Sequence, residues 1–343
     1  MLFRSANLCK RPNAIFTHMK VLIIRFSSIG DIVLTTPVVR CLKKQLKGAE
    51  IHYLTKNVFR TLLVANPYVD RIHSIENDVS EVIAELKNEQ FDLVIDLHKN
   101  IRSRSVKKKL GVKSFAFNKL NPEKWFMVNF KVNRLPKVHI VDRYFETVEH
   151  LGVQKDERGL DHYIPSDEEM DVGTLPEGFR HGYVAFAIGG GHFTKRLPKH
   201  KIIEICEELG MPIILLGGPE EVEAAAEIEK HLGGQVLNLA GELSLHGSAS
   251  LIEQAESVIT HDSGMMHIAA AFNKKVISIW GNTIPEFGMY PYMPGHSDRV
   301  KIVEVRGLSC RPCSKIGFDK CPKGHFNCME QIEIDEVVRS VSE

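Results

Sequence analysis

The stretch ITHDSGMMHIAAAF, residues 259–272, joins an apolar run to an alanine-rich run through a short polar junction. The apolar residues that lead into it, SVIT (257–260), predict a buried strand, and the alanine-rich residues predict a helix that begins near Gly264. In a doubly wound parallel sheet, such a junction lies at the carboxyl ends of the strands, where ligands bind. The stretch therefore predicts an α/β fold with a ligand site at this edge.

The alternation of strand and helix extends in both directions from this stretch. The predicted strands are VLIIRF (21–26), IHYLT (51–55), RIHSI (71–75), DLVID (92–96), SFAF (114–117), YVAFAI (183–188), PIILL (212–216), QVLNL (235–239), SVIT (257–260) and VISIW (276–280). Helical stretches separate them, the first at residues 31–46, and this alternation is typical of parallel sheets with helices on both faces. The 343 residues are enough for two such domains facing each other across a cleft.

Interruptions of the pattern mark the domain boundaries. Pro, Gly and acidic residues gather in residues 152–181 and indicate an interdomain linker. We therefore expect a loose extension over 1–18, a first Rossmann-like domain over 19–160, a linker over 161–181 and a second domain over 182–330. A last helix is expected within 331–343, at about Ile332–Val341.

Composition narrows the classes of protein that fit. Apolar residues make up 43% and charged residues 25%, as in ordinary soluble globular proteins. The apolar runs are strand-sized, so we expect no membrane-spanning helix. Residues 99–137 contain many lysines and arginines but a single acidic residue, Glu123. This basic stretch favours an anionic partner, and the alternative is a solvated helix face.

The junction after residue 260 carries groups that suit a phosphate. Unpaired amides and the positive dipole end at a helix start attract anions, and Gly264 permits close approach of the backbone. Ser263 and His267 lie four residues apart and face the same side of the first turn. The alternative is that Asp262 or Ser263 only caps the helix.

Three more motifs follow predicted strands. IGGGHFTKRLPKH (188–200) combines three glycines with Lys195 and suits a diphosphate, although it is neither a Walker A loop nor a G-x-G-x-x-G turn. LLGGPEEVEAA (215–225) places Glu220 where an acid can bind ribose hydroxyls. RFSSIGDIVLTTP (25–37) places Asp31 at a helix start, where a carboxylate either caps the helix or acts as a general base. A flexible turn and a solvated glutamate are the alternatives for the first two motifs.

In this order, the four elements resemble glycosyltransferase family 9, the ADP-heptose:lipopolysaccharide heptosyltransferases. The resemblance runs from about Lys20 to the carboxyl terminus and rests on SSIGD, TKRLP, GGPE and DSGMMHIAAA followed by VISIWGNT. Leu197 in TKRLP stands where the family more often has Trp. The resemblance implies a GT-B architecture, with the donor on the second domain, the acceptor on the first, and the final helix packed back against the first domain.

The resemblance also implies an inverting transfer with no metal or other cofactor in catalysis. Asp31 matches the general base, and Asp262 matches a contact to the donor sugar. The residues that match donor nucleotide and diphosphate contacts are Gly190, Gly191, Lys195, Glu220, Ser263, Gly264 and His267. The chemistry agrees, because a departing nucleoside diphosphate gains negative charge that positive and amide groups must meet.

The implied partners are a nucleotide-sugar donor, ADP-heptose, and an anionic lipid-linked oligosaccharide acceptor of the lipopolysaccharide core, with no nucleic acid. Within the basic stretch we assign acceptor binding to Arg102, Arg104 and Lys107, next to Lys108 and Lys109. We expect a cytoplasmic protein in peripheral contact with the inner membrane surface.

Four of the seven cysteines cluster near the end of the chain. An odd number with one cluster argues for a reducing compartment rather than a secreted disulfide framework. Cys310, Cys313, Cys321 and Cys328 have the spacing C-x2-C-x7-C-x6-C, which suits a structural zinc site, with His325 as a substitute ligand. Reduced thiols packed in a loop and a pair of disulfides are the alternatives.

Two other functions fit parts of the pattern. A nucleotide-sugar epimerase would keep this architecture, but the basic first domain and Asp31 at the sheet edge weigh against it. A two-lobed binding protein without turnover would normally be exported, and residues 1–18 lack the continuous apolar core of a secretion signal. The missing G-x-G-x-x-G motif disfavours a dinucleotide oxidoreductase. The leading prediction is therefore a glycosyltransferase.

Overall fold

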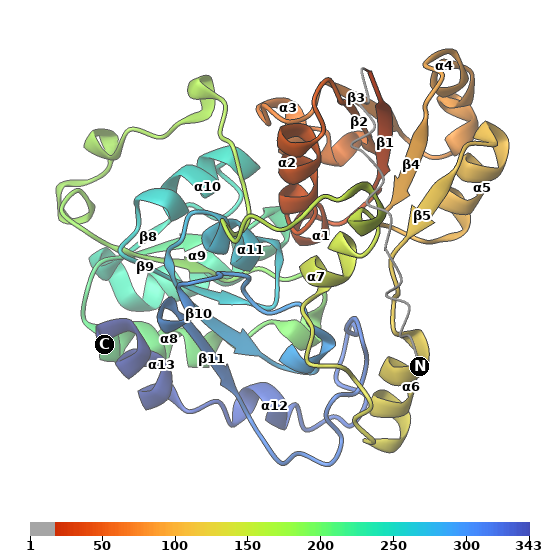
Figure 1. The fold of residues 1–343 in the computed structure, drawn as a ribbon. Helices are drawn as coiled ribbons and strands as arrows, with labels where there is room; N and C mark the ends of the chain where they lie inside the picture. Colours follow the sequence, from red (N-terminus) through yellow and green to blue (C-terminus); the bar gives the residue numbers. More distant parts are fainter. Residues whose placement is uncertain (1–17) are drawn as a thin grey trace, which may run out of the picture.

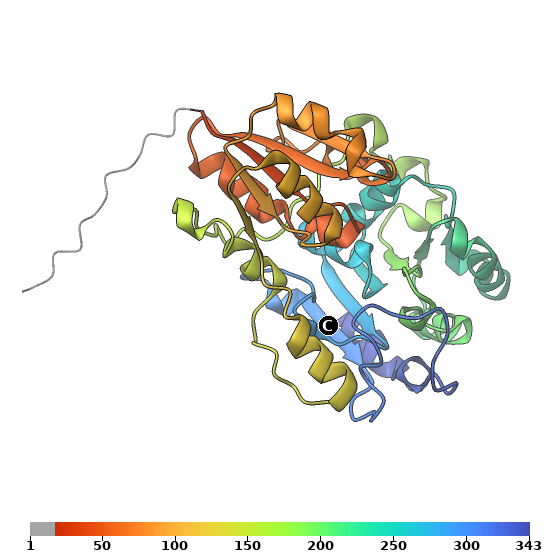
Figure 2. The same ribbon diagram turned by 90° about the vertical axis from the view of Figure 1, so that its right-hand side faces the viewer.

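The computed structural model describes residues 18–343, which form two α/β domains with parallel sheets (Figure 1). The extension predicted for residues 1–18 falls outside the described residues except for His18. Seen from the side, the two domains lie one above the other (Figure 2). No helix in the described range is both long and apolar enough to cross a membrane.

The first domain contains a five-stranded parallel sheet in the order β3-β2-β1-β4-β5. Its central strand is almost fully buried, because helices cover both faces of the sheet. The elements of this domain are β1 (Lys20–Ile24), α1 (Ile29–Val33), α2 (Thr36–Gln45), β2 (Glu50–Lys56), α3 (Thr61–Val64), β3 (Arg71–Ile75), α4 (Ile83–Asn88), β4 (Leu93–Asp96), α5 (Ile101–Leu110), β5 (Ser114–Ala116), α6 (Asn121–Phe130) and α7 (Ile140–Phe145).

The second domain contains a six-stranded parallel sheet in the order β11-β10-β9-β6-β7-β8. The elements of this domain are β6 (Val184–Ala187), α8 (Lys199–Leu209), β7 (Ile213–Leu216), α9 (Val222–Leu232), β8 (Val236–Asn238), α10 (Leu245–Gln254), β9 (Ser257–His261), α11 (Gly264–Ala271), β10 (Lys275–Trp280), β11 (Val300–Glu304), α12 (Asn327–Glu330) and α13 (Ile334–Ser342). The stretch 259–272 forms the end of β9 and all of α11, as predicted.

Every predicted strand is present, with ends displaced by at most two residues. The helix predicted over 31–46 is divided into α1 and α2, because Pro37 lacks the backbone N–H that would donate to the Val33 carbonyl in a continuous helix. The sequence does not predict β11, an edge strand whose residues are mostly half-buried.

The last helix contradicts one expectation from the family resemblance. α13 packs against α8, β10 and β11 of the second domain, not against the first domain. Its residues Ile334 and Val337 join the apolar core beneath α8, and Lys275 Nζ donates to the Val341 carbonyl at 2.9 Å. The reason is that β11, the loop after it (305–326) and α12 all belong to the second domain. The chain therefore enters α13 next to the second sheet, and the apolar face of this helix is buried there.

Two glycines allow the domains to meet closely at α1 and α11. A Cβ added at Gly264 would lie 2.7 Å from Cγ2 of Ile29, and one added at Gly30 would overlap the ring of His267. Farther out, α6 extends from the first domain alongside the second (Figure 2), and Lys131 Nζ donates to the Pro312 carbonyl at 2.7 Å. Elements of both domains therefore border the space between them.

Candidate active site

A cleft of about 610 Å³ lies between the domains at the carboxyl ends of their strands. The segments that line it include those after β1 and β5 in the first domain and those after β6, β9 and β11 in the second. The predicted site residues that it brings together are Asp31, Gly191, Lys195, Asp262, Ser263, Gly264 and His267. Residues more than 200 positions apart in the sequence thus share one cavity, as the prediction of a ligand site at the sheet edges requires.

Asp31 lies on the first-domain side of the cleft in a network of fixed contacts. Its Oδ2 accepts hydrogen bonds from the backbone N–H and hydroxyl of Ser28, at 3.1 and 3.0 Å, and its Oδ1 lies 2.6 Å from Nη2 of Arg25. Burial alone would raise the pKa of Asp31, but the Arg25 guanidinium and the Ser28 hydrogen bonds outweigh burial and hold this pKa below its ordinary value. The carboxylate is therefore ionised at neutral pH.

Lys195 and Asp262 lie on the opposite, second-domain side. Lys195 Nζ is 2.6 Å from Oδ2 of Asp262, and the same oxygen accepts a hydrogen bond from Thr283 Oγ1 at 2.7 Å. Both charged side chains are partly exposed to the cleft. Lys195 Nζ also donates to the Asp262 carbonyl at 3.2 Å, so one of its three N–H donors is left for an anion in the cleft.

The start of α11 faces the cleft next to this pair. Ser263 is the N-cap residue, but its side chain makes no hydrogen bond to the first-turn amides, so these amides remain available to an anion. His267, one turn into the helix, is buried, and burial lowers its pKa to about 4. It is therefore neutral at pH 7 and can act as a hydrogen-bond donor or acceptor, but not as a positive charge. Its Nδ1 has no hydrogen-bond partner among the described residues.

Two predicted donor contacts lie outside the residues that line the cleft. Gly190 packs against Arg196 next to the cleft, and Glu220 is exposed at the start of the turn after β7. Its neighbour Glu221 is the buried acid of this turn. The Glu221 carboxylate is satisfied there, since its Oε2 accepts from the Gly218 N–H at 2.9 Å and its Oε1 lies 2.9 Å from Nη1 of Arg196. The GGPE motif thus forms a rigid turn, and the ribose role of Glu220 remains a prediction.

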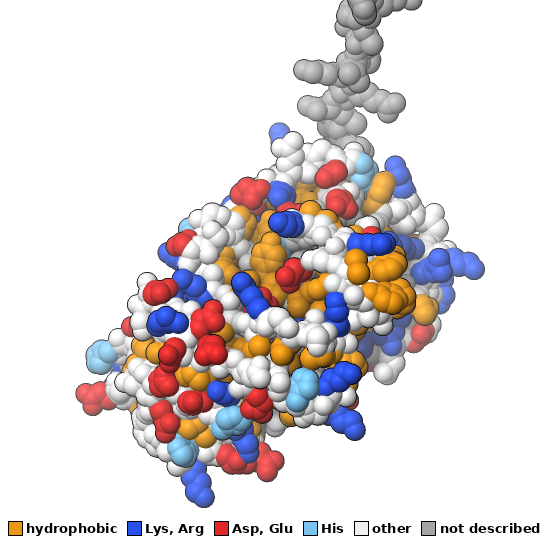
Figure 3. All heavy atoms as spheres, turned by 90° about the horizontal axis from the view of Figure 1, so that it is seen from below, with side chains coloured by type: hydrophobic (Ala, Val, Ile, Leu, Met, Phe, Trp, Pro, Cys, Tyr) orange, Lys and Arg blue, Asp and Glu red, His pale blue; other side chains and the backbone are white. Residues whose placement is uncertain are grey.

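The predicted acceptor residues on α5 do not line the cleft either. Arg102 and Arg104 are exposed, whereas Lys107 Nζ lies 2.7 Å from Oδ2 of the fully buried Asp96. Lys107 therefore neutralises a buried charge in the first domain. Figure 3 shows many acidic side chains at the lower left of the view from below, interspersed with basic ones, and further basic side chains along the right-hand edge.

Four basic residues that sequence reasoning did not select line the cleft near Asp31: Arg25, Lys119, Lys124 and Lys315. Burial, together with the neighbouring charges of Arg143, Lys315 and Lys119, lowers the pKa of Lys124 to about 8. Burial and the charge of Arg25 also lower the pKa of Lys119. In the described structure, neither lysine has a carboxylate partner. The excess of basic residues over 99–137 includes Lys119 and Lys124 and so indicated an anion site in this region. The sequence alone could not distinguish these two lysines from the exposed basic residues of α5.

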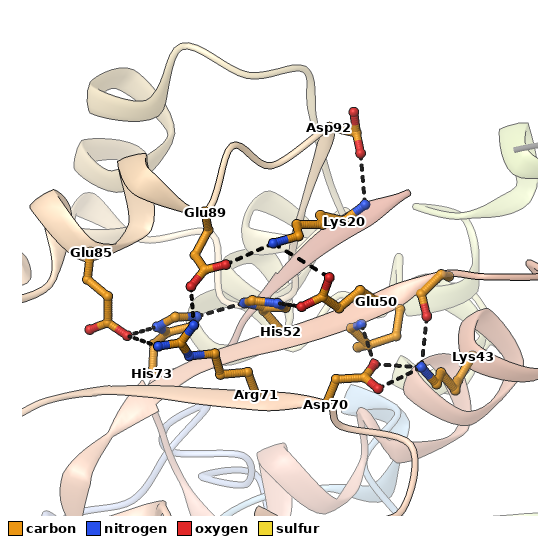
Figure 4. Close-up of polar contacts among 12 residues, drawn as sticks. Lys20, Lys43, Glu50, His52, Asp70, Arg71, His73, Glu85, Glu89 and Asp92 are labelled. Atoms are coloured by element: carbon orange, nitrogen blue, oxygen red, sulfur yellow. Dashed lines mark hydrogen bonds and ion pairs between the residues drawn. The ribbon is translucent and has the colours of Figure 1, made fainter. Parts of the chain in front are cut away.

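A group of potential metal ligands also occurs away from the cleft, in the first domain (Figure 4). The ligand atoms of His52, His73 and Glu89 lie within 4.8 Å of one another. However, His52 Nδ1 and His73 Nε2 form a hydrogen bond of 2.8 Å with each other, and their outer nitrogens bind Glu50 and Glu85. Glu89 pairs with Lys20 and Arg71. Every ligand atom is already engaged, so this network ties the edge strand β3 to the sheet.

Comparison with known proteins gives one family and a set of related enzymes. Residues 79–320 match the profile of a family described as glycosyltransferase family 9 (heptosyltransferase). The chain is 24% identical to lipopolysaccharide heptosyltransferase 1 of Campylobacter coli over 295 residues, covering 77% of this chain and 84% of the relative. It is 25% identical to lipooligosaccharide heptosyltransferase 2 of Haemophilus influenzae over 321 residues, covering 84% and 89%.

Solved structures share the fold. The glycosyltransferase family 9 structure from Veillonella parvula has a TM-score of 0.75 and 21% identity, covering 94% of this chain and 96% of that one. The Escherichia coli ADP-heptose LPS heptosyltransferase II structure has a TM-score of 0.70 and 21% identity, covering 94% and 98%. These matches confirm the predicted arrangement of two Rossmann-like domains facing each other across a cleft.

Proposed function

Because this chain belongs to glycosyltransferase family 9, we propose that it is an inverting glycosyltransferase that moves heptose from ADP-heptose to a lipid-linked acceptor of the lipopolysaccharide core. Its glycosyltransferase activity follows from the family. The names of the relatives, lipopolysaccharide and lipooligosaccharide heptosyltransferases, support the choice of sugar and acceptor. The mechanism rests on one observation: Asp31 lines the cleft from the first domain, and Lys195 and the start of α11 line it from the second.

The second-domain side suits the donor diphosphate. Lys195 supplies a positive charge, and the start of α11, whose first amides no side chain caps, borders the cleft. His267 is neutral, so it contributes a hydrogen bond rather than a charge. As the bond between the anomeric carbon and the phosphate oxygen breaks, its electron pair goes to the diphosphate. These groups then stabilise the added negative charge.

The first-domain side suits the incoming acceptor hydroxyl. In our proposal the hydroxyl oxygen bonds to the anomeric carbon on the face opposite the departing phosphate, and the hydroxyl proton passes to Asp31. Because the base and the diphosphate site come from opposite domains, this geometry favours inversion of the anomeric carbon. The low pKa of Asp31 makes it a weak base, so proton transfer must accompany bond formation, when the hydroxyl becomes acidic.

The charges in the cleft favour catalysis without a metal. Transferases that use a divalent cation bind it through carboxylate clusters, whereas this cleft pairs Asp31 with Arg25 and Asp262 with Lys195. Each carboxylate already has a positive partner within 2.6 Å. Lysine and amide groups thus take the place of a cation at the diphosphate.

Lys119, Lys124 and Lys315 extend the proposal to the acceptor. They line the Asp31 part of the cleft without carboxylate partners of their own, so an acceptor with phosphate or carboxylate groups would neutralise them. The exposed Arg102 and Arg104 are better placed for an anionic lipid surface than for the acceptor group in the cleft. In this proposal the cleft lysines bind the acceptor, while the exposed arginines of α5 hold the protein in peripheral contact with the cytoplasmic side of the inner membrane.

The decisive test is Asp31→Asn, which keeps the size of the side chain but removes its negative charge. We expect turnover of ADP-heptose with a lipid A-linked core acceptor to fall about 10²- to 10⁴-fold, while ADP binding stays within about twofold of wild type. Asp335→Asn is the matched control, because Asp335 also lies in the first turn of a helix but is exposed on α13. Wild-type turnover by Asp31→Asn would remove this residue from the mechanism.

Two measurements test the rest of the proposal. NMR of the product should show an anomeric configuration opposite to that of the donor; retention would refute the inverting mechanism. A thermal-shift screen of ADP, UDP, GDP and NAD should show stabilisation by ADP, because a ligand that binds the native state raises its apparent stability. Stabilisation by NAD alone, or conversion of the free nucleotide sugar into an epimer, would overturn the glycosyltransferase assignment.

A further inference from the structure

A long irregular loop carries three of the four clustered cysteines, and the fourth, Cys328, lies in α12 just after it; the loop also contributes to the cleft. Residues 305–326 contain no helix or strand between the end of β11 and the start of α12. Lys315 and Ile316, at the middle of this loop, line the cleft that contains Asp31. Since loops of this length without secondary structure are rarely rigid by themselves, the position of Lys315 requires a specific constraint.

Hydrogen bonds fix the two sides of this loop but not its centre. Arg311 binds the carbonyls of Gly281 and Thr283 at 2.6 and 2.8 Å. Thr194 exchanges hydrogen bonds with the backbone of Phe318 at 2.8 and 3.1 Å. The apolar side chains Ile316 and Phe318 are 54% and 39% exposed, so they supply little hydrophobic burial. The cysteines offer a further way to connect the turns of the loop.

The cysteines are reduced and lie near one another. All described cysteines are free thiols, so neither of the disulfides considered from the sequence is present. The Cys328 side chain is buried in an apolar cluster against which the half-buried Cys321 also packs, and Cys313 Sγ donates to the Cys310 carbonyl at 3.1 Å. Cys310 Sγ also lies 3.8 Å from His325 Nε2. The four cysteines, separated by up to 18 positions in the sequence, thus belong to one continuous segment made of the loop and the start of α12.

We propose that Cys310, Cys313, Cys321 and Cys328 bind one structural zinc ion that fixes this loop and so positions Lys315 in the cleft. Four sulfurs with a leading C-x2-C suit zinc, which prefers four thiolates in a closed tetrahedral site. His325 then donates a hydrogen bond to the Cys310 sulfur as an outer partner. No water or substrate position is left open, so the ion has no part in the sugar transfer.

The four sulfur atoms are spaced more widely than in a closed zinc site. Within residues 18–343, no three of these sulfur and imidazole atoms lie within 4.8 Å of one another, whereas sulfurs bound to one zinc at about 2.3 Å are about 3.8 Å apart. Zinc binding must therefore draw the turns of the loop inward. The loop can follow, because it is irregular and its central residues are exposed.

Metal analysis of the full chain purified without chelators tests the proposal. We expect about one zinc per chain by mass spectrometry of the metal, and about one cobalt per chain after exchange, with the intense near-ultraviolet absorption of cobalt–thiolate bonds. Cys321→Ser should lower the bound metal at least about tenfold. The matched control is Cys206→Ser, a buried thiol in α8 far from the loop, which should retain the metal.

Kinetics separate this site from the donor site. Removal of zinc with a chelator should raise the acceptor KM and leave ADP affinity unchanged, because only Lys315 and its neighbours lose their positions. ADP binding also shows that Cys321→Ser is folded. Absence of zinc and of a cobalt–thiolate spectrum in wild type, iron in place of zinc, or full zinc content in Cys321→Ser would each overturn the assignment. None of these outcomes depends on the identity of the transferred sugar.

Discussion

The contact between α1 and α11 predicts that Gly264→Ala impairs catalysis by moving Asp31. The added Cβ would lie 2.7 Å from Cγ2 and 2.8 Å from Cβ of Ile29. Carbon atoms prefer separations of about 3.5–4.0 Å, so one element must move by about 1 Å. The core of the second domain holds α11 through the fully buried Met266 and Ile268, whereas α1 is a helix of only five residues.

We expect the movement of α1 to reduce the turnover rate more than the affinity for ADP. Asp31 follows Ile29 by two residues in the same turn, so a shift of α1 displaces its carboxylate from the acceptor hydroxyl. Overpacking of this kind costs about 1–3 kcal/mol of stability, and a misplacement of about 1 Å reduces the rate about 10²-fold. ADP affinity should fall less, because Lys195 and most of the diphosphate surface remain in place.

Steady-state turnover, ADP titration calorimetry and thermal melting measure the three effects. Gly234→Ala is the control, since a Cβ there would meet no atom within 4 Å. The double variant with Ile29→Ala removes Cγ2 and should recover part of the lost rate. Turnover within about twofold of wild type in Gly264→Ala would show that α1 does not transmit the clash to Asp31, and the reasoning would fail.

Two more predictions concern lysines in the cleft. Lys195→Ala should weaken ADP binding about 10- to 100-fold in calorimetry, because it removes a charged hydrogen bond to the diphosphate. The control is Lys199→Ala, which breaks a neighbouring exposed ion pair with Glu227 and should leave ADP binding unchanged. Equal affinity for ADP in Lys195→Ala and wild type would reject the phosphate role of Lys195. The pKa of Lys124 is lowered to about 8, so Lys124 is charged below this pH and loses its charge above it. The acceptor KM should therefore rise as the pH increases through about 8, and Lys124→Arg should remove this rise; a KM that is flat up to pH 10 in wild type would contradict the anionic subsite.

The sequence predicted the strands and the residues at their ends. The apolar run that ends at Thr260 and the alanine-rich run that follows locate Asp262, Ser263 and Gly264 at the edge of a sheet, and the structure places them in the cleft. The same reasoning located Asp31 and Lys195. It succeeded because strand and helix periodicity are local properties, and the carboxyl ends of parallel strands share one edge.

The tertiary structure decided which charges act together. Lys124 and Lys315 lie almost two hundred residues apart and belong to different domains, so only domain packing brings them to the same cavity. Packing also turned Lys107 toward the buried Asp96 and placed α13 on the second domain. The sequence shows that a residue is basic, but it does not show which way the side chain points. Its partner is set by the neighbours that become available when surfaces distant in the chain are buried together.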